Sequence, residues 1–144
     1  MAFDTLFAAT AISGSGMTAE RFRMETIANN LANANSTRSA NGGPFRRQDV
    51  VFAEVLGGAL RPGGLPDLRG VRVVNTVEDQ SPLNRMYQPG HPDADAEGFV
   101  MMPNVQLPIE MVNLITASRA YEANAKAAQT FKTMNEQALG LLRG

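Results

Sequence analysis

The sequence predicts an α+β fold in which long N- and C-terminal helices pack as a coiled-coil-like pair beside a small β-rich middle module. Both ends of the 144-residue chain carry apolar residues at helical spacing. Most of the thirteen glycines and eight prolines lie between these ends, together with short runs of strand-like alternation. The predicted segments are an N-terminal assembly helix (1–38), a β-rich module (39–106) with a flexible loop at 57–70, and a C-terminal assembly helix (107–144).

The C-terminal helix is expected over residues 108–142. Proline is tolerated in a first turn, and the carboxylate of Glu110 suits the positive end of the helix dipole there. Its apolar residues form two stripes, Met111, Leu114, Tyr121, Ala125 and Ala128 in one, and Ala117, Ala120, Ala127, Phe131, Met134, Ala138 and Leu141 in the other. Stripes on two faces predict helical neighbours on more than one side, although the pattern also suits an ordinary core helix of a small bundle.

The N-terminal helix is expected over residues 3–33. It repeats Phe3, Thr10, Met17, Met24 and Leu31 every seven residues, with Leu6 and Ile27 on an adjacent row. Gly14 and Gly16 weaken its middle by about 1 kcal/mol each. The polar Arg23, Glu25 and Asn30 are placed on the opposite side.

An isolated helix of this kind is marginal in water, so we expect the two terminal helices to pack on each other and on neighbours. The residues expected at the assembly interface are Phe3, Phe7, Met17, Met24, Ile27, Leu31, Met111, Leu114, Tyr121, Ala128, Phe131, Met134 and Leu141.

Three strands are predicted in the middle of the chain. The asparagine-rich segment 29–37 ends the first helix, because asparagine side chains compete for backbone hydrogen bonds. Residues 71–77 alternate most clearly, and residues 50–55 and 99–102 read as further strands.

The composition excludes several classes of function. A net charge of −1 gives no electrostatic basis for binding nucleic acid. The absence of cysteine excludes disulfides and thiolate chemistry, and no apolar run is long enough to span a membrane. The first residues lack the basic region of a secretory signal, so a chain that leaves the cytoplasm is expected to use another export route.

The most enzyme-like stretch is PGHPDADAEGFV, residues 89–100, which holds the only histidine, His91. Asp93, Asp95 and Glu97 match ligand positions of a calcium loop, but Asn104 stands where a bidentate glutamate is needed. We therefore expect a solvated acidic turn. A small hydrolase or calcium protein that uses His91, Asp93 and Asp95 is the remote alternative.

No other motif indicates catalysis. The chain has no nucleophile elbow, phosphate-binding loop or dinucleotide fingerprint. Arg46 and Arg47 are expected to form a local salt bridge, and Tyr121 is expected in a core or interface. The sequence thus predicts a protein that is not an enzyme and has no cofactor or metal site.

Three stretches resemble the bacterial flagellar rod and hook proteins. Residues 15–39 (SGMTAERFRMETIANNLANANSTRS) resemble the N-terminal helix and asparagine-rich signature of that family. Residues 110–134 (EMVNLITASRAYEANAKAAQTFKTM) resemble its C-terminal helix. Residues 77–105 (VEDQSPLNRMYQPGHPDADAEGFVMMPNV) are similar to the stretch that distinguishes a proximal rod member. Small departures at 83–84 and 107–108 affect only where the last helix starts.

The resemblance implies a structural subunit of the proximal rod of the basal body, which transmits motor torque across the periplasm. It implies export through the flagellar type III system without a cleaved signal, and helical assembly around the export channel. Expected partners are copies of the chain and other rod proteins, with export-gate and basal-ring components nearby. A cytoplasmic helical adaptor with a β insert is the alternative.

Overall fold

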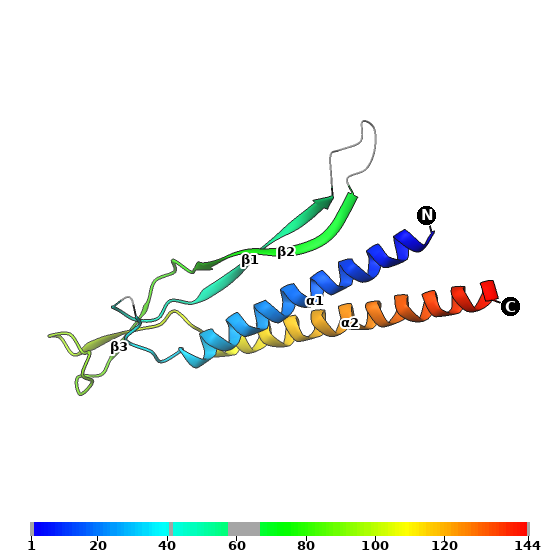
Figure 1. Ribbon diagram of the computed structural model, residues 1–144. Coiled ribbons are helices and arrows are strands. Elements are labelled where there is room, and N and C mark those ends of the chain that lie inside the picture. The colour runs from blue at the N-terminus through cyan, green and yellow to red at the C-terminus, as the bar shows by residue number, and fades with distance from the viewer. Residues whose placement is uncertain (1, 41, 58–66, 144) are drawn as a thin grey trace. The chain divides into compact units, whose positions relative to one another are not determined.

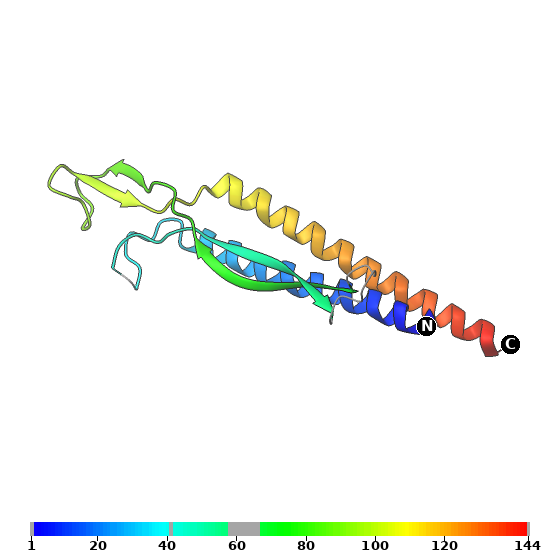
Figure 2. The same ribbon diagram turned by 90° about the horizontal axis from the view of Figure 1, so that it is seen from above.

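The computed structural model describes residues 2–40, 42–57 and 67–143, and the side chains of 8–40, 42–55 and 69–141. A long helix lies at each end of the chain, and the four strands come between them in the sequence (Figures 1 and 2). This confirms the α+β prediction. In chain order the elements are α1 (Ala2–Ala32), β1 (Gln48–Gly57), β2 (Asp67–Glu78), β3 (Asn84–Tyr87), β4 (Phe99–Met102) and α2 (Leu107–Arg143).

Both helices begin and end within one residue of their predicted bounds. After Ala32 the chain leaves α1 through hydrogen bonds made by its asparagines. The Asn33 side chain donates to the Asn29 carbonyl at 2.9 Å, and its Oδ1 accepts from the Ser36 hydroxyl at 3.1 Å. Asparagine thus ends the helix as predicted, because its side chain supplies bonds that another helical turn would have supplied.

The strands form two separate two-stranded sheets, β1–β2 and β3–β4. The three predicted strands are present, and β4 has its predicted bounds. The fourth, β3, was not predicted, because its four residues pair with β4 but are all exposed and carry no alternation. Of the loop predicted at 57–70, Gly57 belongs to β1 and residues 67–70 belong to β2. Residues 58–66 lie outside the described part of the chain.

The chain divides into two compact units. Each unit contains a portion of α1, a portion of α2 and a portion of the segment between them. The first unit comprises residues 1–22, 51–75 and 116–144, and the second comprises 23–50 and 76–115. The division into two assembly helices and a β module concerns the roles of these segments, and it stays a prediction.

In the first unit, α1 runs beside α2 in the opposite direction (Figures 1 and 2). The two helices approach closely at Gly16. A Cβ atom built there would lie 2.9 Å from Oδ1 of Asn124, whereas one at Gly14 would meet nothing within 4 Å. Asn124 is held in place because its amide donates to the Ala120 carbonyl at 2.9 Å. Gly16 therefore permits helix packing, which outweighs its poor helix propensity.

Strand β2 is joined to α1 in the first unit by Ser15. The Ser15 hydroxyl donates to the Ile12 carbonyl at 2.7 Å and accepts from the Val71 backbone N–H at 3.1 Å. The neighbouring Gly70 has φ +101°, and a Cβ there would overlap the Ser15 hydroxyl. Only glycine fits this contact without strain.

In the second unit, the β3–β4 hairpin carries an aromatic cluster. The Arg85 guanidinium lies 4.1 Å from the centre of the Phe99 ring, and the Tyr87 ring meets Phe99 edge-on at 5.2 Å. Gly98, at φ +84°, makes the turn before β4, where a Cβ would lie 2.9 Å from Tyr87. Val100, on β4, is 1% exposed and anchors the hairpin in the unit.

The described core is small and unusually polar. Its buried apolar residues are Ala19, Ile27, Ala34, Val100, Val105 and Ala117. Almost as many buried residues are polar, namely Ser13, Thr26, Asn30, Asn104 and Glu110. Because buried polar groups stabilise a fold only when they are hydrogen-bonded, much of the chain's order depends on specific polar contacts.

The two glycines of α1 should respond oppositely to alanine. Gly14→Ala should raise the free energy of unfolding by up to about 1 kcal/mol, since alanine favours the helix and has open space there. Gly16→Ala should lower it by roughly 1–2 kcal/mol, because the new methyl group displaces Asn124. Denaturant unfolding followed by circular dichroism measures both, and equal shifts in the two variants would contradict the packing at Gly16.

Candidate functional site

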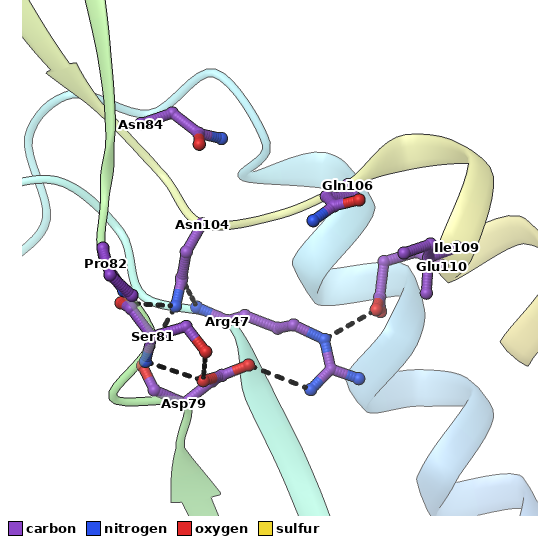
Figure 3. A pocket seen from close by; sticks show the side chains of 9 residues that line it. All are labelled: Arg47, Asp79, Ser81, Pro82, Asn84, Asn104, Gln106, Ile109 and Glu110. Atoms are coloured by element: carbon purple, nitrogen blue, oxygen red, sulfur yellow. Dashed lines mark hydrogen bonds and ion pairs between the residues drawn. The ribbon is translucent and has the colours of Figure 1, made fainter.

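The most specific feature of the second unit is an ion pair between Glu110 and Arg47 (Figure 3). Glu110 lies in the first turn of α2 and is 0% exposed. The Arg47 Nε donates to its Oε1 at 2.7 Å, and the Asn30 amide donates to Oε2 at 3.0 Å. The sequence analysis related Glu110 to the positive end of the helix dipole. Because the carboxylate is fully buried, it needs a charged partner, and Arg47 is that partner.

Arg47 connects Glu110 to two further carboxylates. Its Nη1 lies 3.3 Å from Oδ2 of Asp49 and 3.7 Å from Oδ2 of Asp79. Burial acts to lower the pKa of Arg47, but the hydrogen bond and charge of Glu110, together with Asp49, raise it above its ordinary value. The predicted local salt bridge of Arg47 is confirmed.

Asn30 joins α1 to the start of β1. Its Oδ1 accepts from the Gln48 backbone N–H at 2.9 Å, and its amide donates to the Gln48 carbonyl at 2.8 Å. The side chain thus satisfies both backbone groups of Gln48, as a paired strand would. The placement of Asn30 on the polar side of α1, opposite the apolar rows, was wrong, because Asn30 is 0% exposed and also bonded to Glu110.

Asn104 makes an equivalent connection just before α2. Its Oδ1 accepts from the Arg47 backbone N–H at 2.8 Å, and its amide donates to the carbonyls of Asp79 and Ser81 at 3.0 and 3.3 Å. The Ser81 hydroxyl and backbone N–H hold the pKa of Asp79 below its ordinary value, and the nearby arginines add to this.

We call Asn30, Arg47, Asn104 and Glu110 the polar joint. The joint ties the end of α1, the start of β1, the residue that follows β2 and the first turn of α2 into one unit. A cavity of about 220 Å³ lies against it, lined by residues that include Ser81. The polar groups there bond mainly to one another (Figure 3), an arrangement suited to rigidity.

Two sequence signals point to this joint in retrospect. The first is the asparagine pair at 29–30. The second is the position of Glu110, which has the large apolar residues Ile109, Met111 and Val112 as neighbours in the sequence. Adjacent residues of a helix point in different directions, so the carboxylate and most of these apolar side chains lie on different faces. Neither signal identifies Arg47 as the partner.

The acidic turn at 93–97 faces basic side chains. Asp93 accepts from the Thr37 hydroxyl at 2.8 Å and pairs with Arg38, while Arg85 pairs with Asp95 at 3.3 Å and with Glu97 at 2.6 Å. Among the described residues, no group of three or more carboxylates or histidines converges as a metal site requires.

Hydrogen bonds explain the titration of this turn. The Thr37 hydroxyl holds the pKa of Asp93 below its ordinary value, with Arg38 and His91 adding to the effect. The backbone N–H groups of Phe99 and Glu97, and then Arg85, do the same for Asp95. Both aspartates are therefore structural parts of the turn.

The predicted interface residues differ widely in exposure. Ile27 is buried, whereas Met111, Met134 and Leu141 are 58%, 48% and 85% exposed. The half-buried members are Met17, Met24, Leu31, Leu114, Tyr121, Ala128 and Phe131. The side chains of Phe3 and Phe7 lie outside the described residues. Further exposed apolar residues on α2 were not predicted as interface: Leu107, Ile109, Val112, Ile115 and Leu139.

Two families of known proteins match the two ends of the chain. Residues 11–38 match the flagella basal body rod protein family, and residues 96–141 match the C-terminal family of the flagellar basal body rod FlgEFG proteins. These ranges include Asn30, Asn104 and Glu110 of the polar joint.

Relatives extend the similarity to almost the whole chain. The flagellar basal-body rod protein FlgC of Borreliella burgdorferi is 41% identical over 150 aligned residues, which cover 96% of this chain and 99% of the relative. The chain belongs to the FlgC family of flagellar basal-body rod proteins. FlgC of Bacillus subtilis is 39% identical over 94% of this chain and 97% of its own length. FlgC of Escherichia coli O6:H1 is 42% identical over 90% and 92%.

FlgC membership confirms the resemblance found in the sequence. In the part of the chain that the structure describes, neither helix is long and apolar enough to cross a membrane. The family matches cover most of α1, β4 and nearly all of α2, but neither contains Arg47 or Asp79.

Glu110→Gln tests the polar joint. The amide keeps the shape of the side chain but removes the charge that Arg47 faces, so the free energy of unfolding should fall by about 3 kcal/mol. Glu122→Gln, an exposed change on the same helix, should shift it by less than about 0.5 kcal/mol. Urea unfolding of both variants gives the comparison, and similar stabilities would exclude a structural role for the pair.

Acid should open the 93–97 turn. The folded pKa values of Asp93 and Asp95 lie below the unfolded value of about 3.9. Their contribution to the stability of the turn is therefore complete well above a pH of about 3.9. It is lost as the pH falls from there through the lower, folded pKa values. The protection factor of the Phe99 amide, which is its intrinsic exchange rate at each pH divided by its observed rate in NMR, should fall on acidification. Asp95→Asn should flatten this dependence and Glu54→Gln should leave it unchanged; a flat wild-type profile would contradict the assignment.

Proposed function

We propose that this chain is a structural subunit of the proximal rod of the bacterial flagellar basal body and acts by assembly, without catalysis, cofactor or metal. The observation that carries the proposal is the similarity to proteins named FlgC over nearly the full length of both chains. In this role it assembles helically with copies of itself and with other rod proteins, surrounds the export channel and transmits motor torque.

The burial pattern supports assembly as the function. Large apolar side chains remain exposed along α2, while the core formed by the described residues is small and contains almost as many polar as apolar residues. Single exposed apolar residues are ordinary, but a series along one helix is typical of a surface that another protein covers. The proposed interface comprises the thirteen residues expected from the sequence, with the terminal segments 1–38 and 107–144 as assembly helices and 39–106 as the module that contacts neighbours.

The polar joint supports torque transmission. A rod subunit must resist relative movement of its parts, and the joint holds four elements of the second unit by hydrogen bonds with defined geometry. Fully satisfied buried polar networks give this kind of rigidity.

The resemblance to the family supports the location and the route. In the proposal the chain leaves the cytoplasm through the flagellar type III system without a cleaved signal, and it resides in the part of the rod that crosses the periplasm. Export-gate and basal-ring components then lie nearby, and no contact with nucleic acid is involved.

Mass spectrometry of purified hook–basal bodies from the source organism tests the proposal. The chain should be present in an amount similar to that of other rod subunits, and deletion of its gene should abolish swimming until the wild-type gene is restored. Intact basal bodies that lack the chain, with the protein retained in the cytoplasm, would overturn the proposal and favour the adaptor.

A further inference from the structure

The β3–β4 hairpin has backbone groups without partners along the outer side of β3. In an antiparallel ladder, residues that bond to the facing strand alternate with residues whose N–H and C=O groups point outward. The Gln88 N–H donates to the Gly98 carbonyl at 2.8 Å, which places Met86 among the bonded residues and turns the backbone groups of Arg85 and Tyr87 outward. Nothing in residues 2–40, 42–57 and 67–143 bonds to these outward groups, which we call the open edge.

The outer side of β4 is mostly closed by comparison. Phe99 also turns its backbone groups outward, but its N–H donates to Oδ1 of Asp95 at 2.8 Å, and its C=O accepts from the Asp95 N–H at 2.8 Å. The acidic turn thus occupies the position of a neighbouring strand. One further residue of β4, Met101, points outward, and a single residue is too short a run for strand pairing.

The open edge lacks the features that usually protect an edge strand. Soluble proteins place a projecting charge, a proline or a bulge there. β3 contains no proline, and its four residues pair with β4 in unbroken register. Its one charged side chain, Arg85, is turned back over β4, where its guanidinium lies 4.1 Å from the centre of the Phe99 ring and 2.6 Å from Glu97. Another strand can therefore approach the open edge without meeting a charged side chain.

Large apolar side chains flank the open edge on both faces of the hairpin. Met86 is 46% exposed on one face, and Tyr87 is 63% exposed on the other. The Tyr87 ring is held in place, because it meets Phe99 edge-on at 5.2 Å and lies against Gly98, where a Cβ would come within 2.9 Å of it. A rigid aromatic ring loses little entropy on binding, so an added strand gains apolar contact on each face.

The charges beside the open edge favour a basic partner. Asp95 and Glu97 share the single guanidinium of Arg85, so two negative charges face one positive charge. The neighbouring Asp93 is paired with Arg38 and adds no net charge. An acidic segment would be repelled here, whereas a lysine or arginine would meet Glu97, whose side chain is 72% exposed.

We propose that β3 binds an extended segment of another protein chain as a third strand, through hydrogen bonds to the open edge. The segment carries apolar residues at adjacent positions, one for each face, and a lysine or arginine near Glu97. Main-chain bonds of this kind supply affinity, and the side chains supply specificity. The inference rests on the proposed function, because the segment belongs to another subunit of the rod.

Hydrogen exchange in purified hook–basal bodies tests the open edge directly. The bodies are placed in D₂O for a series of times, dissociated at low pH, and analysed by mass spectrometry with fragmentation to single residues. An added strand should slow exchange of the Arg85 and Tyr87 amides at least about tenfold relative to their intrinsic rates, as β4 does for Met86. Fast exchange at Arg85 and Tyr87 beside slow exchange at Met86 would overturn the inference and leave the proposed function intact.

Proline variants separate the backbone from the side chain. Tyr87→Pro removes an outward N–H and leaves the bonds between β3 and β4 in place, whereas Tyr87→Ala removes the side chain alone. In strains that lack the wild-type gene, hook–basal bodies should contain roughly three- to tenfold less of the Tyr87→Pro chain than of the Tyr87→Ala chain. Equal amounts of the two would contradict the contact.

The matched control makes the same change on the other edge. Met101→Pro removes an outward N–H of β4, and Met101→Ala is its side-chain counterpart. These two chains should be present in equal amounts, because no strand is proposed beside β4. A loss in Met101→Pro as large as that in Tyr87→Pro would show that proline acts by disturbing the hairpin, and the exchange experiment on the wild-type chain then decides.

A photoreactive side chain identifies the partner. Tyr87 is replaced by p-benzoylphenylalanine, the hook–basal bodies are irradiated, and the joined peptides are sequenced by mass spectrometry. The joined segment should belong to another rod subunit and carry a lysine or arginine beside adjacent apolar residues. An acidic segment or one from a terminal helix would refute the inference. Absence of the wild-type chain from basal bodies would refute the proposed function and this contact together.

Discussion

The second unit of the structure depends on one buried charge. Glu110 has no exposed surface, and an isolated carboxylate in such a place would cost several kcal/mol. Arg47 supplies the opposite charge and Asn30 a further hydrogen bond. Their positions in turn fix the start of β1, and Asn104 fixes the end of β2 against the same segment. The arrangement of these elements follows from the need to satisfy one group that cannot reach water.

The two units use different physics to hold the terminal helices together. In the first unit the helices meet through small residues, where the absence of a side chain at Gly16 admits Asn124 and Ala117 is fully buried. In the second unit they meet through Asn30 and Glu110. Small-residue contacts give close approach, whereas hydrogen-bonded pairs give a defined register. Their combination suits a subunit that must present the remaining faces of its helices to other proteins.

Sequence reasoning predicted the elements much better than the contacts between them. Helical periodicity placed both long helices, and alternation placed β2, because each depends on local spacing alone. The strand-like runs at 50–55 and 99–102 placed β1 and β4. It missed β3, whose exposed residues carry no alternation. It also placed Asn30 opposite the apolar rows of α1 and related Glu110 only to the helix dipole, because periodicity groups polar residues apart from the core. Recognising their role needs Arg47, which is 63 positions from Glu110 and unrelated to any periodic pattern.

The long sequence separations within the polar joint have a consequence for when it can form. Asn30 and Glu110 lie 80 positions apart, and Arg47 lies 63 positions from Glu110. Such contacts require closure of long loops, which is slow and costs chain entropy. Because Glu110 comes 63 positions after Arg47, a growing chain lacks this carboxylate until most of its residues have been made. The joint therefore closes late, after the helical turns and the β3–β4 hairpin, whose contacts are local and can form first.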